Sequence, residues 1–220
     1  LDSCVVTALM RPAAVLWDMD GTIVDTEPYW ILAQAELVGA WGGEWSDEDA
    51  VSLVGSGLWN SARVIQQHGV HLTEDEIVDH LTDRVLEQLR EFGSHWRPGA
   101  ITLLQEIRNA GIPTALVTMS VGRMAEHVAA QLGFVGFDLI VSGEDVEHPK
   151  PHPAPYLQAA RQLGVEIVHC VALEDSVPGV ASAVASGAVT IAVPFMIDIP
   201  ESKFHAIWPS LEGRGLVDLN

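Results

Sequence analysis

The sequence AAVLWDMDGT at residues 13–22 places a short, wholly apolar run directly before two aspartates. An apolar run of this length without polar alternation is typical of a central strand in a parallel sheet, because helices cover both faces of such a strand. Similar runs follow along the chain at residues 114–117, 139–141, 168–173 and 189–193. The sequence therefore predicts a sheet that contains five buried parallel strands.

Helical patterns fill the intervals between these runs. The expected helices end at Gly111, Gly133, Gly164 and Gly187, and they cover residues 100–110, 121–132, 155–163 and 177–186. Glycine commonly ends a helix because it accepts positive φ without a Cβ clash. Strands that alternate with helices predict an α/β domain with right-handed crossovers, in which a Rossmann-like parallel sheet forms the core.

Residues 26–96 show a different pattern, with helical periodicity and no convincing strand. Helices are expected at residues 29–38, 47–54, 58–67 and 74–92, and Ser46 and Thr73 are the expected N-caps of the second and fourth. Pro98-Gly99 breaks the chain before the α/β pattern resumes. The sequence therefore predicts an α/β core domain of residues 1–25 and 97–220, interrupted by an all-helical domain of residues 26–96.

The charge balance excludes some classes of partner. The 220 residues include 11 basic and 30 acidic side chains, for a formal net charge of −19. Nucleic-acid backbones and anionic membrane surfaces would repel such a chain, so neither is an expected partner. A metal ion or a local cationic group would still allow an anionic small molecule to bind.

The cysteines and the N-terminal segment point to a reducing compartment. Cys4 and Cys170 are too few for a disulfide framework, and Cys170 lies in an apolar run that predicts a buried free thiol. Residues 1–10 include Asp2 and lack the basic stretch of a signal peptide. We expect a cytoplasmic monomer.

One uncharged stretch, residues 176–197, is long enough to cross a bilayer. It is interrupted by Pro178, Gly179, Gly187 and Pro194. A buried helix, a turn and a buried strand explain this stretch better than a membrane span.

Polar side chains follow four of the expected strands. Asp18, Thr118 and the pair Glu174-Asp175 come directly after strands, and Lys150 lies in the loop after another. Ligands of open parallel sheets bind beyond the carboxyl ends of the strands. One acidic residue there would usually be a helix cap or a solvated loop residue, but the joint pattern predicts a binding site.

The chemistry of this site is most specific at Asp18 and Asp20. Alternation along an extended segment places both carboxylates on one side, where they repel each other unless a proton or a metal ion intervenes. Mg²⁺ suits such hard oxygen ligands, and Asp175 offers a third carboxylate. Gly21 allows the backbone to turn and to approach a ligand closely. Lys150, between two prolines, supplies the balancing positive charge.

These motifs, in this order, resemble the four motifs of the haloacid dehalogenase-like phosphohydrolases, and the similarity covers nearly the whole chain. The residues concerned are Asp18-Met19-Asp20-Gly21-Thr22, Thr118, Lys150-Pro151 and Glu174-Asp175-Ser176. Two further segments are similar to the subgroup of sugar-phosphate phosphatases, phosphoglycolate phosphatases and β-phosphoglucomutase. They are Asp25-Thr26-Glu27-Pro28 and the stretch from Gly143-Glu144 through Lys150-Pro151-His152-Pro153 to Tyr156.

The resemblance implies a covalent mechanism. Asp18 attacks phosphorus to form an aspartyl-phosphate, and Asp20 first gives a proton to the leaving group and then takes one from water. It also implies that Mg²⁺ is held by Asp18, the backbone carbonyl of Asp20 and Asp175, with Glu174 either binding the metal through water or orienting Lys150. The intact Asp20 and Asp175 favour phosphoryl transfer over dehalogenation.

Phosphate binding is expected from Thr118, Met119, Ser120 and Lys150. The family often has Asn directly after the residue that corresponds to Thr118. Here Met119 offers its backbone amide but no side-chain hydrogen bond, and Ser120 compensates.

The resemblance also implies that the helical insert is a mobile cap, whose expected substrate contacts are Glu27, Gly55, Ser56 and Asn60. Caps similar to that of β-phosphoglucomutase carry an arginine shortly after the glycine that corresponds to Gly55, whereas the nearest basic residue here is Arg63. The expected function is therefore a Mg²⁺-dependent phosphatase that hydrolyses a small phosphate monoester. Glu27 would repel a substrate carboxylate, which favours a sugar phosphate. A phosphomutase and a non-catalytic phosphate-binding protein remain alternatives.

Overall fold

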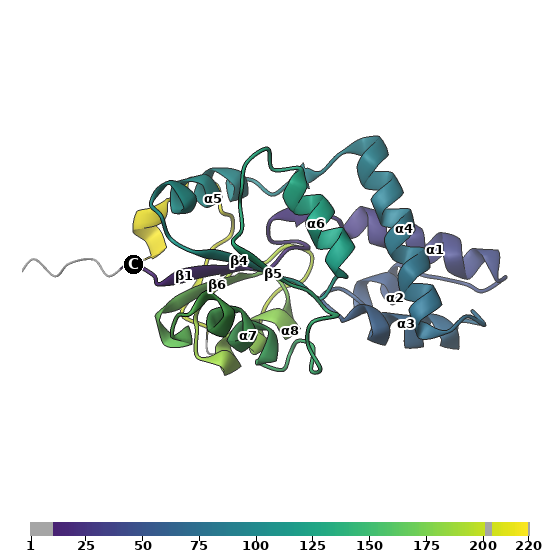
Figure 1. The fold of residues 1–220 in the computed structure, drawn as a ribbon. Coiled ribbons are helices and arrows are strands. Elements are labelled where there is room, and N and C mark those ends of the chain that lie inside the picture. Colours follow the sequence, from purple (N-terminus) through teal and green to yellow (C-terminus); the bar gives the residue numbers. More distant parts are fainter. Residues whose placement is uncertain (1–10, 201–203, 220) are drawn as a thin grey trace, which may run out of the picture.

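The computed structural model describes residues 11–200 and 204–219, and its main sheet is parallel throughout, in the order β5-β4-β1-β6-β7-β8 (Figure 1). The predicted α/β class and the order of its elements are confirmed. The strands are β1 (Ala14–Trp17), β4 (Thr114–Val117), β5 (Leu139–Val141), β6 (Cys170–Glu174), β7 (Val189–Ala192) and β8 (Ala206–Ile207).

Helices cover both faces of this sheet (Figure 1). The alternate residues of β1 show the division, since Val15 and Trp17 belong to one cluster of buried apolar side chains and Ala14 and Leu16 to another. The first cluster includes side chains of α5 (Ala100–Asn109) and α6 (Gly122–Ala130), and the second includes those of α7 (Ala154–Leu163) and α8 (Val177–Ser186). Burial on both faces explains why the strand sequences are apolar without alternation.

Four helices make up most of the insert: α1 (Glu27–Ala40), α2 (Asp47–Ser52), α3 (Leu58–Gln67) and α4 (Glu74–Phe92). The predicted capping is present, because the hydroxyls of Ser46 and Thr73 accept hydrogen bonds from the backbone N–H groups three residues later. The long helix α4 packs against α1 and α3. Helix α1 begins two residues earlier than predicted, because Pro28 fits the first turn of a helix. The N–H groups of a first turn have no partner within the helix, so the missing N–H of proline costs no hydrogen bond there.

A short two-stranded ribbon connects the insert to the sheet domain. Strand β2 (Val24–Asp25) pairs antiparallel with β3 (His95–Trp96), so the expectation of no strand within residues 26–96 was wrong at its last two residues. The sequence gives little signal for a pairing of two residues, because the pairing depends on where the insert returns. The predicted domain boundaries stay a prediction, and they fall at the ends of this ribbon.

The C-terminal half departs from expectation at two places. Strand β6 starts at Cys170 rather than residue 168, because a 3₁₀ turn (Ile167–His169) precedes it. Strand β8 was not predicted, and a second 3₁₀ turn (Leu216–Leu219) follows it. The uncharged stretch from residue 176 contains α8 and β7, as expected.

The predicted buried free thiol of Cys170 is confirmed, and burial raises its pKa to about 11. Residues 1–10, with Cys4, lie outside the described part of the chain. No helix within residues 11–200 and 204–219 combines the length and the apolar character that crossing a bilayer requires. The cytoplasmic location and the monomeric state stay predictions.

Candidate active site

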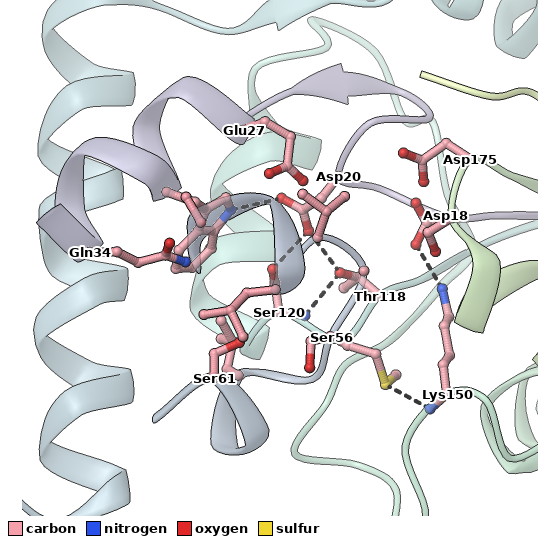
Figure 2. Close-up of a pocket in the computed structure, with 18 residues that line it drawn as sticks. Asp18, Asp20, Glu27, Gln34, Ser56, Ser61, Thr118, Ser120, Lys150 and Asp175 are labelled. Carbon is pink, nitrogen blue, oxygen red and sulfur yellow. Dashed lines mark hydrogen bonds and ion pairs between the residues drawn. The ribbon is translucent and has the colours of Figure 1, made fainter. Parts of the chain in front are cut away.

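Lys150 lies at the centre of the carboxyl edge of the sheet. Its ammonium donates hydrogen bonds to Asp18 Oδ1 at 2.7 Å, to Glu174 Oε1 at 2.6 Å and to the Val117 carbonyl at 2.8 Å. Only 6 % of Lys150 is exposed, and Figure 2 shows its side chain directed at Asp18. Burial alone would lower the pKa of Lys150, but the charges of Asp18 and Glu174 outweigh burial and raise it. Lys150 is therefore a fixed, charged donor.

Glu174 is fully buried beneath this lysine. Its Oε1 accepts hydrogen bonds from Lys150 and, at 2.6 Å, from the Tyr156 hydroxyl. Of the two roles predicted for Glu174, orienting Lys150 is the one that this geometry fits directly. Tyr156 belongs to one of the sequence motifs, but its hydrogen bond to Glu174 was not predicted.

Asp18, Glu174 and Asp175 form a carboxylate cluster, in which one oxygen of each residue lies within 4.8 Å of the others. Desolvation, followed by repulsion from Glu174, raises the pKa of Asp18 to about 7. Desolvation and repulsion from Asp18 likewise raise the pKa of Asp175 well above its usual value. One ammonium faces three carboxylates, so the cluster favours a further cation or bound protons.

Gly21 is required for this cluster to form. Its φ is +84°, and a Cβ built there would lie 2.0 Å from Asp175 Oδ2. The sequence predicted that Gly21 allows a close approach. In the structure, the group approached is the Asp175 carboxylate.

Asp20 is held separately by four donors. Its Oδ1 accepts from the Thr26 hydroxyl and, at 3.2 Å, from the Trp30 indole N–H. Its Oδ2 accepts from Thr118 Oγ1 at 3.2 Å and from Ser120 Oγ at 2.8 Å (Figure 2). The two hydroxyls predicted to hold phosphate thus hold Asp20 in this structure.

Met119 connects two loops of the site. Its sulfur accepts a hydrogen bond from the backbone N–H of Lys150 at 3.3 Å, a contact that the sequence does not indicate. Thioether sulfur is a weak acceptor. The contact links the loop after β4 to the loop that carries Lys150.

A cavity between the sheet domain and the helical insert opens over these groups (Figure 2). The predicted residues that line it are Asp18, Asp20, Glu27, Gly55, Ser56, Thr118, Met119, Ser120, Lys150 and Asp175. Glu174 lies below the lining. Asn60 is not brought to this cavity; it donates to Ser56 Oγ at 2.7 Å and lines a neighbouring hollow. Gly55 is packed closely against the sheet domain, since a Cβ there would lie 2.6 Å from Ser176 Cβ.

The lining residues that were not predicted include Trp30, Gln34 and Ser61. Trp30 and Gln34 lie three and seven residues after Glu27, which is the spacing of one helix face, so extending that face along α1 would have found them. Ser61 belongs to α3, and its position depends on how α3 packs. No local sequence signal indicates it.

Glu27 is buried at the edge of the cavity. Desolvation, followed by repulsion from Asp20 and Asp25, raises its pKa to about 8. Between its ordinary value of 4.5 and about 8, the folded state therefore retains a proton that the unfolded chain releases. The contribution of Glu27 to the free energy of unfolding falls as pH rises through this range.

Replacing Glu27 with Gln is expected to raise the melting temperature, measured in a metal chelator, by an amount that grows from pH 5 to pH 9. At the upper end the gain is on the order of a few kcal/mol. Glu126 is exposed on α6, and Glu126→Gln is the matched control for the loss of a carboxylate. A Glu27→Gln effect of equal size at pH 5 and pH 9 would contradict the assignment.

The fold and this arrangement of aspartates and lysine define a class of protein. The haloacid dehalogenase-like hydrolase family matches residues 12–187, and the chain belongs to that family. The predicted family and fold class are thereby confirmed.

Individual relatives narrow the comparison. The chain is 31 % identical over 179 residues to fructose-1-phosphate phosphatase YqaB of Escherichia coli. The alignment covers 80 % of this chain and 94 % of that protein. The chain is 30 % identical over 189 residues to hexitol phosphatase B of the same organism, covering 82 % and 83 %. The expected enzyme class, a phosphoric monoester hydrolase, is confirmed by these named phosphatases.

Solved structures have the same architecture. CbbY from Rhodobacter sphaeroides, in complex with xylulose-(1,5)bisphosphate, superposes with a TM-score of 0.87 at 28 % identity and covers 95 % of this chain and 99 % of that one. A β-phosphoglucomutase from Clostridium difficile superposes with a TM-score of 0.79 at 22 % identity, covering 91 % and 92 %. The second likeness concerns the fold alone.

Proposed function

We propose that this hydrolase is a Mg²⁺-dependent phosphatase of sugar phosphates that works through an aspartyl-phosphate on Asp18. The observation that carries the proposal is the Asp18 carboxylate, held by a buried Lys150 beside Asp175 and facing the cavity. The two phosphatase relatives act on fructose 1-phosphate and on hexitol phosphates, as their names state. These names support a phosphorylated polyhydroxy compound as the substrate.

The residues of the carboxylate cluster fit a divalent cation. Their oxygens are hard ligands, and the raised pKa values of Asp18 and Asp175 reflect a buried negative charge that Lys150 leaves incompletely balanced. Asp18 and Asp175 would hold Mg²⁺ directly. When bound, Mg²⁺ supplies charge neutralisation at the phosphoryl oxygens, which reduces their repulsion of an anionic nucleophile.

Two displacements at phosphorus make up the reaction. In the first, an Asp18 oxygen bonds to phosphorus, the ester P–O bond breaks, and Asp20 protonates the departing alkoxide. In the second, Asp20 accepts a proton from water as the water oxygen bonds to phosphorus, and the bond to Asp18 breaks. Lys150 stays charged throughout, and its positive charge offsets the negative charge of Asp18 and of the phosphoryl oxygens.

Thr118 and Ser120 connect phosphate binding to Asp20. Each hydroxyl has a single hydrogen to donate, and both now donate to Asp20 Oδ2. When these hydroxyls donate instead to phosphoryl oxygens, Asp20 loses two of its donors. Its carboxyl is then free to reach the leaving oxygen.

Hydrolysis is favoured over a mutase reaction by the lining of the cavity. Among the described residues that line it, the basic one is Lys150, and this ammonium is already paired with Asp18 and Glu174. Arg63, the basic residue nearest in sequence to Gly55, instead pairs with Glu74 at 3.0 Å. A mutase must hold a second phosphate, for which this lining offers no free cation.

The deciding experiment is a phosphate-release screen over phosphate monoesters, with Mg²⁺ present or chelated. Stoichiometric inorganic phosphate from hexose or hexitol phosphates supports the proposal. Migration of phosphate within the substrate without release would instead establish a mutase, and turnover that persists in chelator would overturn the metal dependence.

Magnesium is also expected to stabilise the protein. At a free Mg²⁺ concentration a hundredfold above its Kd, the gain is about 2.7 kcal/mol, or about 5–10 °C in melting temperature. Asp175→Asn removes one carboxylate of the cluster and is expected to abolish most of this shift, whereas Asp198→Asn, at an exposed position, retains it. An equal shift in both variants would rule out the proposed metal site.

A further inference from the structure

Gln34 is a buried amide whose oxygen has no partner. The residue lies on α1 and is 6 % exposed, and its Oε1 makes no hydrogen bond within the described residues. It lines the same cavity as Asp18 (Figure 2). An unsatisfied buried amide costs about 1–3 kcal/mol, so its presence in a native structure needs an explanation.

A second polar group lies at the same end of the cavity. Ser61, on α3, is buried, and its hydroxyl makes only a long contact of 3.5 Å with the Gly57 carbonyl. Figure 2 shows both Gln34 and Ser61 on the side of the site away from Lys150. This end is therefore polar without being charged.

Part of the lining of this cavity is apolar. Trp30, Leu53, Val54 and Leu58 contribute to it. Apolar walls with a few placed hydrogen-bonding groups are typical of sites that bind a neutral small molecule and fix its orientation. A hydroxylated carbon chain suits such a wall, because its C–H groups pack on the apolar side chains while its hydroxyls seek partners.

We propose that Gln34, assisted by Ser61, is a specificity-determining residue that hydrogen-bonds a hydroxyl of the neutral, polyhydroxylated leaving group. The inference rests on the proposed phosphatase function and names what the far end of the cavity recognises. The Gln34 amide carries two N–H donors and an acceptor oxygen, and rotation of the side chain brings the oxygen, which is buried in this structure, to a substrate hydroxyl. A substrate without hydroxyls leaves this amide unpaired, so the enzyme discriminates against it.

The test compares two probes, fructose 1-phosphate and p-nitrophenyl phosphate, with Mg²⁺ present. Gln34→Leu is expected to lower the ratio of kcat/KM for the sugar ester to kcat/KM for the aryl ester by about tenfold. Gln67→Leu is the matched control, since Gln67 is exposed on the neighbouring helix α3, and it leaves the ratio unchanged. An unchanged ratio in Gln34→Leu would overturn the proposal.

A binding measurement tests the role of Gln34 separately from the phosphatase proposal. The Kd of fructose 1-phosphate is measured by calorimetry for Asp18→Asn, with and without Gln34→Leu, and this measurement requires no turnover. An about tenfold weaker Kd in the double variant supports the role of Gln34 even if no ester is hydrolysed, and equal Kd values refute it. If Gln34→Leu fails to fold, Ser61→Ala is expected to lower the same kcat/KM ratio about threefold, and no change there refutes the proposal.

Discussion

Replacing Asp18 with Asn is expected to reduce phosphate release by about 10,000-fold or more, because an amide cannot supply the attacking oxygen. The substitution keeps the side-chain shape, and Lys150 keeps its ion pair with Glu174 at 2.6 Å, so the fold is expected to persist. Removing one charge from the carboxylate cluster should also raise the melting temperature at pH 8 in chelator, since the pKa of Asp18 is raised to about 7.

Three measurements check this prediction. Phosphate release is compared with that of Asp198→Asn, an exposed control of the same chemistry. Mass spectrometry after acid quenching is expected to detect a phosphorylated enzyme in the parent protein but not in Asp18→Asn. Thermal unfolding verifies that the variant is folded. Turnover near the parent rate in a folded Asp18→Asn protein would refute the covalent mechanism.

The second large effect is expected at Lys150. Lys150→Met removes the ammonium from two buried carboxylates, and breaking a buried ion pair in this way costs about 3–5 kcal/mol of stability. Phosphate release should fall about a thousandfold, because a fixed donor to the phosphoryl oxygens is lost.

The loss of stability in Lys150→Met is expected to depend on pH, because carboxylates remain where the ammonium was. Desolvation and repulsion from Glu174 raise the pKa of Asp18, and without the ammonium, which lowers that pKa, Asp18 ionises in the folded state only at a still higher pH. The folded state then binds more protons, and its stability falls as pH rises. The melting-temperature deficit of Lys150→Met is therefore expected to widen from pH 5 to pH 8.

A second substitution isolates the cause. Glu174→Gln, added to Lys150→Met, removes one unpaired charge and is expected to restore part of the stability at pH 8. Arg161→Met, at an exposed position of α7, controls for the loss of a cation and should change little. A double variant that is less stable than Lys150→Met at pH 8 would contradict a charge-based explanation.

Local pattern predicted the sheet well. Strands β4 and β5 have the predicted limits, because each is a short apolar run, fully buried in β4 and partly buried in β5, that loop residues follow at once. Strands β2, β3 and β8 were missed, since two residues carry too little pattern and their pairing depends on distant chain segments. Helix α1 starts earlier than predicted, because proline fits the first turn of a helix.

The candidate site was predicted in composition but not in connectivity. The position of Asp18, Lys150, Glu174 and Asp175 at strand ends is a sequence property, and parallel strands bring those ends to one edge. The sequence does not show which hydroxyl donates to which carboxylate. The hydrogen bonds from Thr118 and Ser120 to Asp20 were therefore not predicted. Gln34 has an ordinary helical sequence context, and its unpaired amide is visible only once the cavity is formed.

The ribbon of β2 and β3 has a consequence for engineering. Because Asp25 pairs with His95, the chain leaves the sheet domain and re-enters it at adjacent points. A graft at these two positions would exchange the helical unit as if it were a long hairpin loop, without disturbing the register of the six parallel strands. Chimaeras of this kind, made between relatives with different preferences, would carry the donor's selectivity, and the graft would have to keep Thr26 and Trp30 because both donate to Asp20.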